Sequence, residues 1–363
     1  MTSQTQTNRL HTIDFARGIS VLIMIAVHTL WMYGSKETQS ESMLGHTIHL
    51  LGKGTAAFLV AMGIALFLTP NNTPKLLVKR GFILLALGYG MNILKFILPI
   101  SAFGTMPETF IQAYGWQSPL TVNQLTYLIS TGDILQLAGI SLILIAPIIS
   151  LSLPSWMYLM LVGISASLSY VGPLISSQPY IAKLFFSQDY QIYFAVFPWI
   201  SAIFAGMFLG KIFVESQLDQ SVLFNACLVS GLGFLALSAP LLLSDFSMHF
   251  NNFFHLKSGG VLYLIGLNFV ALWGIKKLER FWLNTRIYGF IQYCSKHVTS
   301  LYVTQWVLIC WGMGIVGFST LSPTHTLAAM PIVAGTVFAT HTLYVKVSNK
   351  LKKRQPNYTN QVA

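Results

Sequence analysis

Long apolar runs separated by short polar segments extend along almost the whole chain. The runs lie near residues 14–33, 48–69, 76–99, 124–149, 156–175, 192–214, 222–243, 258–276, 287–313 and 326–347. A helix that crosses the hydrocarbon core of a bilayer needs roughly 20 apolar residues, and an open strand would leave its backbone groups unpaired in lipid. The pattern therefore predicts an all-α fold, a polytopic membrane helix bundle with about ten transmembrane helices.

The composition agrees with a protein that is solvated largely by lipid. Hydrophobic residues make up 54% of the chain and charged residues only 9%, whereas an average soluble domain has about 25% charged residues. So few charged side chains cannot cover so much apolar surface in water. No polar stretch is long enough to fold alone, so we expect one transmembrane domain over residues 1–349 and a basic, polar cytoplasmic tail over residues 350–363.

The positive charges indicate an orientation in the membrane. The formal net charge is +11, and the basic residues gather in alternate connections between the apolar runs. With both termini in the cytoplasm, five of the 21 Lys and Arg residues fall on the outer side: Lys36, Lys53, Lys95, Lys183 and Lys257. Because cytoplasmic loops carry the excess of Lys and Arg, we predict that both termini are cytoplasmic. The basic clusters then contact anionic membrane lipid, and no nucleic-acid partner is expected.

The cysteines predict neither a metal site nor a disulfide framework. Cys227, Cys294 and Cys310 lie in or beside apolar segments, and no Cys pair or Cys/His spacing accompanies them. We expect three small, buried hydrophobic side chains. The polar start of the chain leads into an apolar run without a small-residue cleavage pattern, so no cleavable signal peptide is expected.

Three polar residues of the first predicted helix carry most of the functional information. Asp14, Arg17 and His28 lie within or at the start of an apolar run, where each ionisable group costs about 2.5–3.5 kcal/mol on insertion scales. At 100° per residue, Arg17 and His28 fall within about 20° of the same helix face, and Asp14 shares that face with Arg17. The helical rise separates Arg17 from His28 by roughly 16 Å along the axis.

The chemistry of these residues fits transfer of an acyl group. A histidine titrates near neutral pH and can act as a general base towards a sugar hydroxyl, whereas an arginine binds phosphate or carboxylate in a bidentate fashion. Arg17 near the cytoplasmic end therefore suits the charged head of an acyl-CoA, and His28 suits the deeper point of transfer. The alternatives are an Arg17 that pairs with Asp14 and sets topology, and a His28 that only packs.

The segment from Arg9 to His28 resembles the opening of the transmembrane acyltransferase superfamily. This group includes the acyltransferase-3 proteins and relatives of heparan-alpha-glucosaminide N-acetyltransferase. Its first helix begins with an Asp-x-x-Arg-Gly-like segment, here Asp14 to Gly18, and the acyltransferase-3 branch places a histidine where this chain has His28. Weaker likeness continues through residues 58–63, 79–82, 132–136, 197–200 and 295–305.

The resemblance implies that an acyl group, usually acetyl, passes from cytoplasmic acyl-CoA to a sugar or glycan of the cell envelope. Acetyl-CoA would be a co-substrate and no cofactor would stay bound. A glycan or lipid-linked sugar would accept the acetyl group in a bacterial cytoplasmic (inner) membrane, and a homo-oligomer is compatible with this. His28 would act as general base or acyl carrier. In the heparan-type branch the essential histidine follows the first helix, where this chain has His46 and His49, so the identity of the base stays open.

Second-rank candidates lie on later helices. Asp133 and Gln136 are one turn apart, and the same pair suits a helix N-cap and its first turn. Lys53 can pair with Asp133, contact the donor or extend to the interface, and Gln305 can hydrogen-bond across helices. Two polar residues of the third predicted helix, Asn92 and Lys95, are expected to anchor it at the interface.

Aromatic and histidine residues also gather in two predicted outer loops. Tyr114 and Trp116 lie in one loop, and His249 and His255 bracket the other. They can form a platform for carbohydrate, or an aromatic belt at the membrane interface.

A second class of function uses the same first-helix residues. In a proton-coupled transporter, Asp14, Arg17 and His28 would form a proton relay. Secondary transporters are typically built from inverted repeats, and the sequence shows no convincing repeat, which favours the enzyme. A third hypothesis is a structural membrane protein in which Arg17 only sets topology.

Overall fold

The computed structural model describes residues 9–354 except 70–71, 176–178, 188 and 251. The described residues are almost entirely helical and contain only two isolated bridges, Gly34 with Leu321 and Gly132 with Ile192. The helices are α1 (His11–Tyr33), α2 (Lys36–Ser40), α3 (Met43–Gly52), α4 (Thr55–Leu68), α5 (Pro74–Asn92), the π-helix η1 (Ile93–Ala102), α6 (Glu108–Gln112), α7 (Val122–Ile129), α8 (Ile134–Ser150), α9 (Ser155–Ser167), the 3₁₀ turns η2 (Leu168–Tyr170) and η3 (Gly172–Leu174), α10 (Tyr180–Phe186), α11 (Val196–Glu215), α12 (Gln220–Ser244), α13 (Phe246–Phe250), α14 (Ser258–Lys277), α15 (Glu279–Trp282), α16 (Arg286–Lys296), α17 (Val298–Val316) and α18 (Pro323–Arg354).

The all-α, polytopic fold class is confirmed. Within the described ranges, eight helical segments are long and apolar enough to cross a membrane: α1, α3 with α4, α5 with η1, α11, α12, α14, α17 and α18. The helix α8 is apolar but has only 17 residues, and α9 has 13. The total of about ten transmembrane helices therefore stays a prediction.

Several of the expected helices are interrupted, among them the fourth and the ninth. The run near 124–149 is interrupted after α7 at residues 130–133, where Asp133 starts α8 as its N-cap. The run near 287–313 is interrupted at His297, which ends α16 and precedes α17. At each interruption, backbone groups leave the regular helical hydrogen-bond pattern.

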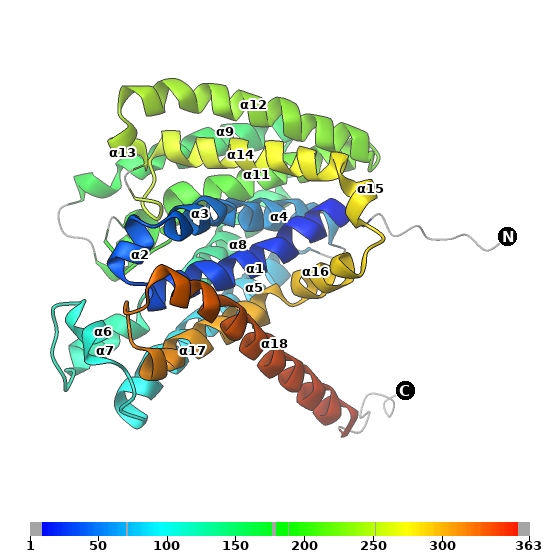
Figure 1. The fold of residues 1–363 in the computed structure, drawn as a ribbon. Helices are drawn as coiled ribbons and strands as arrows, with labels where there is room; N and C mark the ends of the chain where they lie inside the picture. Colours follow the sequence, from blue (N-terminus) through cyan, green and yellow to red (C-terminus); the bar gives the residue numbers. More distant parts are fainter. Residues whose placement is uncertain (1–8, 70–71, 176–178, 188, 251, 355–363) are drawn as a thin grey trace, which may run out of the picture.

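The helix α11 forms the centre of the bundle (Figure 1). It packs extensively against α4 on one side and α9 on another, and most of its residues are buried. The approach to α4 is close because small residues lie at the crossing. A Cβ atom on Gly206 would lie 2.0 Å from the Val60 carbonyl oxygen, and one on Gly63 would lie 2.1 Å from the Ile203 carbonyl oxygen.

The helix α12 lies at the outside of the bundle, over α14 (Figure 1). Its exposed face is apolar and includes Val229 and Leu243, which are 72% and 88% exposed. A soluble protein rarely leaves so continuous an apolar surface in water, so this face is expected to contact lipid tails.

The bundle has two distinct ends. The helices α2, α6, α7 and α13 lie at one end, which we call the outer end in keeping with the predicted orientation (Figure 1). The start of α1, the end of α18 and the helices α15 and α16 lie at the opposite, inner end (Figure 1). The first and last described helices therefore begin and end on the same side, as the predicted cytoplasmic location of both termini requires.

Candidate functional site

A cavity of about 570 Å³ lies in the outer half of the bundle, among the described residues. Its walls come from α1, the end of α3, η1 and α17, together with the segments that close the outer end. Four residues predicted from the sequence line it: His28, His49, Lys53 and Asp133. Five others do not: Asp14, Arg17, His46, Gln136 and Gln305.

His28 lies in the wall of this cavity and is held by aromatic rings. Its imidazole stacks on the Trp306 indole with ring centroids 4.0 Å apart, and Tyr302 meets it edge-on at 5.8 Å. The side chain is buried, and within the described residues its Nδ1 atom has no hydrogen-bond partner. A neutral imidazole has one nitrogen that accepts a hydrogen bond, so the ring is positioned without its acceptor being engaged.

A buried ion pair faces the same cavity. The Nζ atom of Lys95 lies 3.9 Å from Oδ2 of Asp133, and the two side chains are 3% and 6% exposed. Asp133 is also the N-cap of α8: its Oδ1 accepts from the Ile134 amide at 2.7 Å, and its own amide donates to Oε1 of Gln136 at 3.1 Å. The N-cap interpretation of Asp133 and Gln136 is thus confirmed, and it coexists with a place at the cavity.

The expectation that Asn92 and Lys95 anchor a helix at the interface is wrong, since both are buried. Asn92 closes α5, and its side-chain amide donates to the carbonyl oxygens of Ile129 at 2.8 Å and Thr131 at 2.7 Å. Beyond it the chain continues as the π-helix η1. A π-helix turns fewer degrees per residue than an α-helix, so the face on which Lys95 lies cannot be obtained from an α-helical count.

The other predicted residues of the outer half differ in whether they line the cavity. His49 lines the cavity and its Nε2 atom accepts from the Trp31 indole N–H at 3.1 Å, whereas His46 is exposed. Lys53 does not pair with Asp133, because its Nζ atom lies over the Phe250 ring, 5.1 Å from the centroid. Gln305 is fully buried with both amide atoms unbonded within the described residues.

At the inner end, Asp14 is engaged by a residue that the helical count did not consider. Its carboxylate accepts from Nε of Arg9 at 2.6 Å and from Oγ of Ser295 at 2.9 Å. The predicted pairing of Asp14 with Arg17 is therefore replaced by a pairing with Arg9, whose side chain reaches across the first turn of α1. Arg17 is half-buried, and no hydrogen bond or ion pair within the described part of the chain engages its guanidinium.

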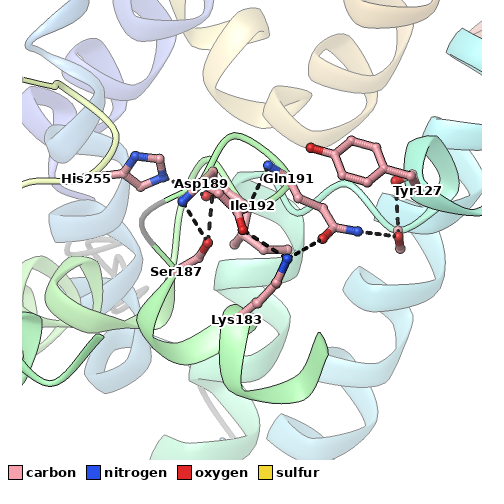
Figure 2. Close-up of polar contacts among 8 residues, drawn as sticks. Tyr127, Lys183, Ser187, Asp189, Gln191, Ile192 and His255 are labelled. Carbon is pink, nitrogen blue, oxygen red and sulfur yellow. Dashed lines mark hydrogen bonds and ion pairs between the residues drawn. The ribbon is translucent and has the colours of Figure 1, made fainter. Parts of the chain in front are cut away.

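A short segment that we call the outer strap, residues 189–195, closes the cavity on its outer side. Figure 2 shows its polar contacts: Nζ of Lys183 lies 3.0 Å from Oδ2 of Asp189 and 3.2 Å from Oε1 of Gln191. Burial alone would raise the pKa of Asp189, but hydrogen bonds from Lys183 and from the Gln191 amide outweigh it and hold this pKa below its usual range.

The outer strap is fixed to its two neighbours through its backbone. The bridge with Gly132 places it directly beside Asp133, through two hydrogen bonds of 2.8 Å. On the other side, Nε2 of His255 donates to the Ile192 carbonyl oxygen at 3.0 Å (Figure 2). Burial lowers the pKa of His255, against the opposing effect of that carbonyl and of Asp189.

Aromatic side chains form the outer part of the cavity wall. Tyr190, Tyr193 and Phe254 line it, and Tyr190 is 56% exposed, which marks the mouth. Of the four loop residues predicted to form a platform, Tyr114 lines the cavity, with Trp116 stacked on it at 4.9 Å. His249 and His255 do not line it: His249 accepts from the Gly259 amide, and His255 binds the outer strap.

The sequence did not identify Lys95, Tyr302 or Trp306 as site residues. The only signal for Lys95 is a lysine inside an apolar run, a position that is also typical of an interfacial anchor. Tyr302 and Trp306 follow one another at a spacing of four residues on α17, one turn apart on one face. Aromatic residues at that spacing are common in buried helices, so nothing in the sequence set them apart.

The three cysteines do not line the cavity. Cys227, Cys294 and Cys310 are buried, as predicted, and each has a free thiol. Among the described residues, no three His, Cys, Asp or Glu side chains are arranged to hold a metal ion.

The family described as heparan-alpha-glucosaminide N-acetyltransferase, catalytic, matches residues 9–239, which is more than half of the chain. The matched region includes α1, the ion pair of Lys95 with Asp133 and the outer strap, and it ends before α17. No curated protein matches the chain.

Proposed function

Because the chain belongs to the heparan-alpha-glucosaminide N-acetyltransferase family and is an integral membrane acetyltransferase, we propose that it transfers acetyl from cytoplasmic acetyl-CoA to an envelope sugar, with His28 at the point of transfer. The observation that carries this proposal is the imidazole of His28 in the wall of a 570 Å³ cavity, held by aromatic rings and without a hydrogen bond to any described residue. A proton acceptor that is buried, oriented by rings and free of partners suits general-base chemistry.

The proposed chemistry begins at the acceptor hydroxyl or amine. His28 takes its proton as the acceptor attacks the thioester carbonyl, and the proton passes on to the departing CoA sulfur. The stack on Trp306 and the edge contact with Tyr302 fix the plane of the imidazole ring. The ring therefore has little rotational freedom to lose when the reaction takes place. The position of His28 also suits a two-step route, in which the imidazole is first acetylated by the donor and then passes the acetyl group to the acceptor.

The donor is proposed to enter from the inner end and bind to Arg17. The guanidinium of Arg17 is unengaged within the described part of the chain, and an arginine is suited to a phosphate of the CoA head. The helical rise places Arg17 roughly 16 Å from His28 along α1. A long, thin pantetheine arm suits such a separation. Asp14, bound to Arg9 and Ser295, orders the inner end beside it.

The acceptor is proposed to enter from the outer end, past the aromatic wall of Tyr190, Tyr193 and Phe254. Aromatic faces pack against the C–H face of a sugar, while His49 and Lys53 supply polar groups deeper in. An envelope glycan or a lipid-linked sugar in a bacterial cytoplasmic membrane fits this position. The proton-relay alternative loses support, because Asp14 and Arg17 lie outside the cavity that contains His28.

The test compares histidine variants of the purified protein in detergent micelles. CoA thiol release from acetyl-CoA is measured with D-glucosamine or D-glucose as acceptor. His28→Ala and His28→Gln should lower kcat by about 10²- to 10⁴-fold, the usual contribution of a general base. The matched control is His46→Ala, because His46 is exposed on α3 outside the cavity. Wild-type kcat in both His28 variants would refute the assignment, and acetylation of D-glucosamine alone would identify an amine acceptor.

A further inference from the structure

Lys95 is a buried cation whose donors are not used. Its side chain is 3% exposed, yet its Nζ atom lies 3.9 Å from the Asp133 carboxylate, beyond the 2.7–3.2 Å of an N–H···O hydrogen bond. No hydrogen bond within the described residues engages this ammonium group, which has three N–H donors. Its positive charge instead lies over two aromatic rings: the Nζ atom is 4.7 Å from the centroid of Phe96 and 4.6 Å from that of Trp306.

The Trp306 indole connects this ammonium with the imidazole of His28. The same Trp306 indole stacks on His28 at 4.0 Å, so one ring contacts both groups, and both line the cavity. The π-helix η1 sets the direction of Lys95, and π-helical turns are frequent at functional sites. Asn92, at the start of η1, binds the backbone of the segment that leads to Asp133, which fixes the partner of Lys95.

We propose that Lys95 is a catalytic residue that stabilises the oxyanion formed on the acetyl carbonyl, an inference that rests on the proposed function of this cavity. As the acceptor atom attacks the carbonyl carbon, the C=O π electrons move to the oxygen and the acceptor proton moves to His28. The Lys95 ammonium donates to that oxygen. The C=O bond then re-forms, the C–S bond breaks, and the CoA thiolate takes the proton from His28, giving acetylated acceptor and CoA thiol.

The charge balance of the site favours this role over a purely structural ion pair. A structural pair in an apolar interior is stabilising only when its geometry is good and its remaining donors are satisfied, and here the pair is long and the donors are open. An oxyanion in the cavity would supply the missing acceptor. Donors aimed at charge that develops in the transition state are among the largest contributions to catalysis.

The experiment measures kcat, KM for acetyl-CoA and the melting temperature of the full chain in detergent, with D-glucosamine and D-glucose as acceptors. We expect Lys95→Met to lower kcat by about 10²- to 10³-fold with little change in KM. Lys95→Arg keeps the cation and should retain more kcat than Lys95→Met. The control is Lys36→Met, an exposed lysine of α2 outside the cavity, which should match the wild type.

A double variant separates catalysis from stability. Lys95→Met with Asp133→Asn removes both charges, so no buried charge is left unpaired and the melting temperature should recover relative to Lys95→Met alone. The proposal expects kcat to remain low in this folded protein, and a return to wild-type kcat would overturn it. His28→Ala, assayed in parallel, tests the proposed function separately: full activity there with loss in Lys95→Met refutes the base while leaving the oxyanion role.

Discussion

Two cations at different depths of the protein differ in what surrounds them. Lys95 is buried against Asp133 and two aromatic rings in the outer half. Arg17 is half-buried towards the inner end, where Arg9 forms an ion pair with the carboxylate of Asp14. An arginine inside an apolar helix is costly. Its guanidinium makes no hydrogen bond or close ion pair with the described residues and is therefore suited to an anionic ligand.

At the residue scale, Arg17→Ala should weaken binding of the donor. A hydrogen bond to a charged group contributes about 1.5–3 kcal/mol, and each 1.4 kcal/mol is tenfold in affinity. We expect KM for acetyl-CoA to rise about 10- to 100-fold, with a smaller change in kcat. Steady-state kinetics of CoA thiol release measure both. Arg286→Gln, which changes an exposed arginine at the start of α16, is the control and should leave KM unchanged. A wild-type KM in Arg17→Ala would contradict the assignment.

Residue-level contacts were only partly predictable from the sequence. The helical count placed His28 on a functional face, and the cavity contains it. The same count paired Asp14 with Arg17, because it compared positions within one helix and ignored the side chain of Arg9, which folds back from the preceding turn. Lys95 was misplaced because its direction depends on a π-helical register, which the residue types of an apolar run do not encode.

Among the elements, the outer strap has the contacts of a pH-sensitive closure. In the neutral ring of His255, Nε2 donates to the Ile192 carbonyl and Nδ1 lies 3.3 Å from Nδ2 of Asn252, whose N–H it can accept. Protonation of Nδ1 would remove that acceptor. Asp189 and Lys257 act on the ring with opposite signs. The neutral histidine is therefore the form that fits the closed strap.

The sign of the pH dependence follows from the direction of the pKa shift. Burial lowers the pKa of His255 in the folded protein, so its contribution to stability is complete above the ordinary value of about 6.5 and is lost as the pH falls through the folded pKa. We expect hydrogen exchange of residues 189–195, corrected for intrinsic rates, to accelerate in acid below about pH 6.5.

The matched variant is His255→Gln, which can still donate to the Ile192 carbonyl but does not titrate. Its exchange in the outer strap should lose most of the pH dependence. The pKa of Asp189 is held low by Lys183 and by backbone donation, so this carboxylate stays ionised over the same range and does not mask the effect. An equal pH dependence in His255→Gln and the wild type would contradict the role of the imidazole.

The elements themselves were largely predictable, and their interruptions were less so. Apolar length identifies a spanning helix because lipid demands internal backbone hydrogen bonds, and eight such segments are present in the described ranges. The break before α8 had a local signal, since Asp133 and Gln136 form a capping box. The break at His297 had none, because the residues on both sides are compatible with one continuous helix.

On the scale of the whole molecule, the proposed reaction takes its donor from one side of the membrane and its acceptor from the other, and α1 carries a residue for each. The 23 residues of α1 extend about 35 Å, enough to cross the hydrocarbon core. Arg17 lies near one end and His28 faces the cavity in the other half. The donor is thus proposed to approach from the end that carries α15 and α16, and the acceptor from the end closed by the outer strap. This direction depends on the orientation of the bundle.

The orientation can be tested by cysteine labelling in intact cells. The three native cysteines are buried and free, so they provide a low background for a membrane-impermeant maleimide. Glu37→Cys is exposed on α2 at the outer end, and Asn284→Cys is exposed between α15 and α16 at the inner end. The excess of Lys and Arg at the inner end predicts that this end faces the cytoplasm. We therefore expect Glu37→Cys to react in intact cells and Asn284→Cys to react only after the membrane is opened. The reverse pattern would place Arg17 outside, where it would have no access to cytoplasmic acetyl-CoA, and the proposed direction of transfer would be wrong.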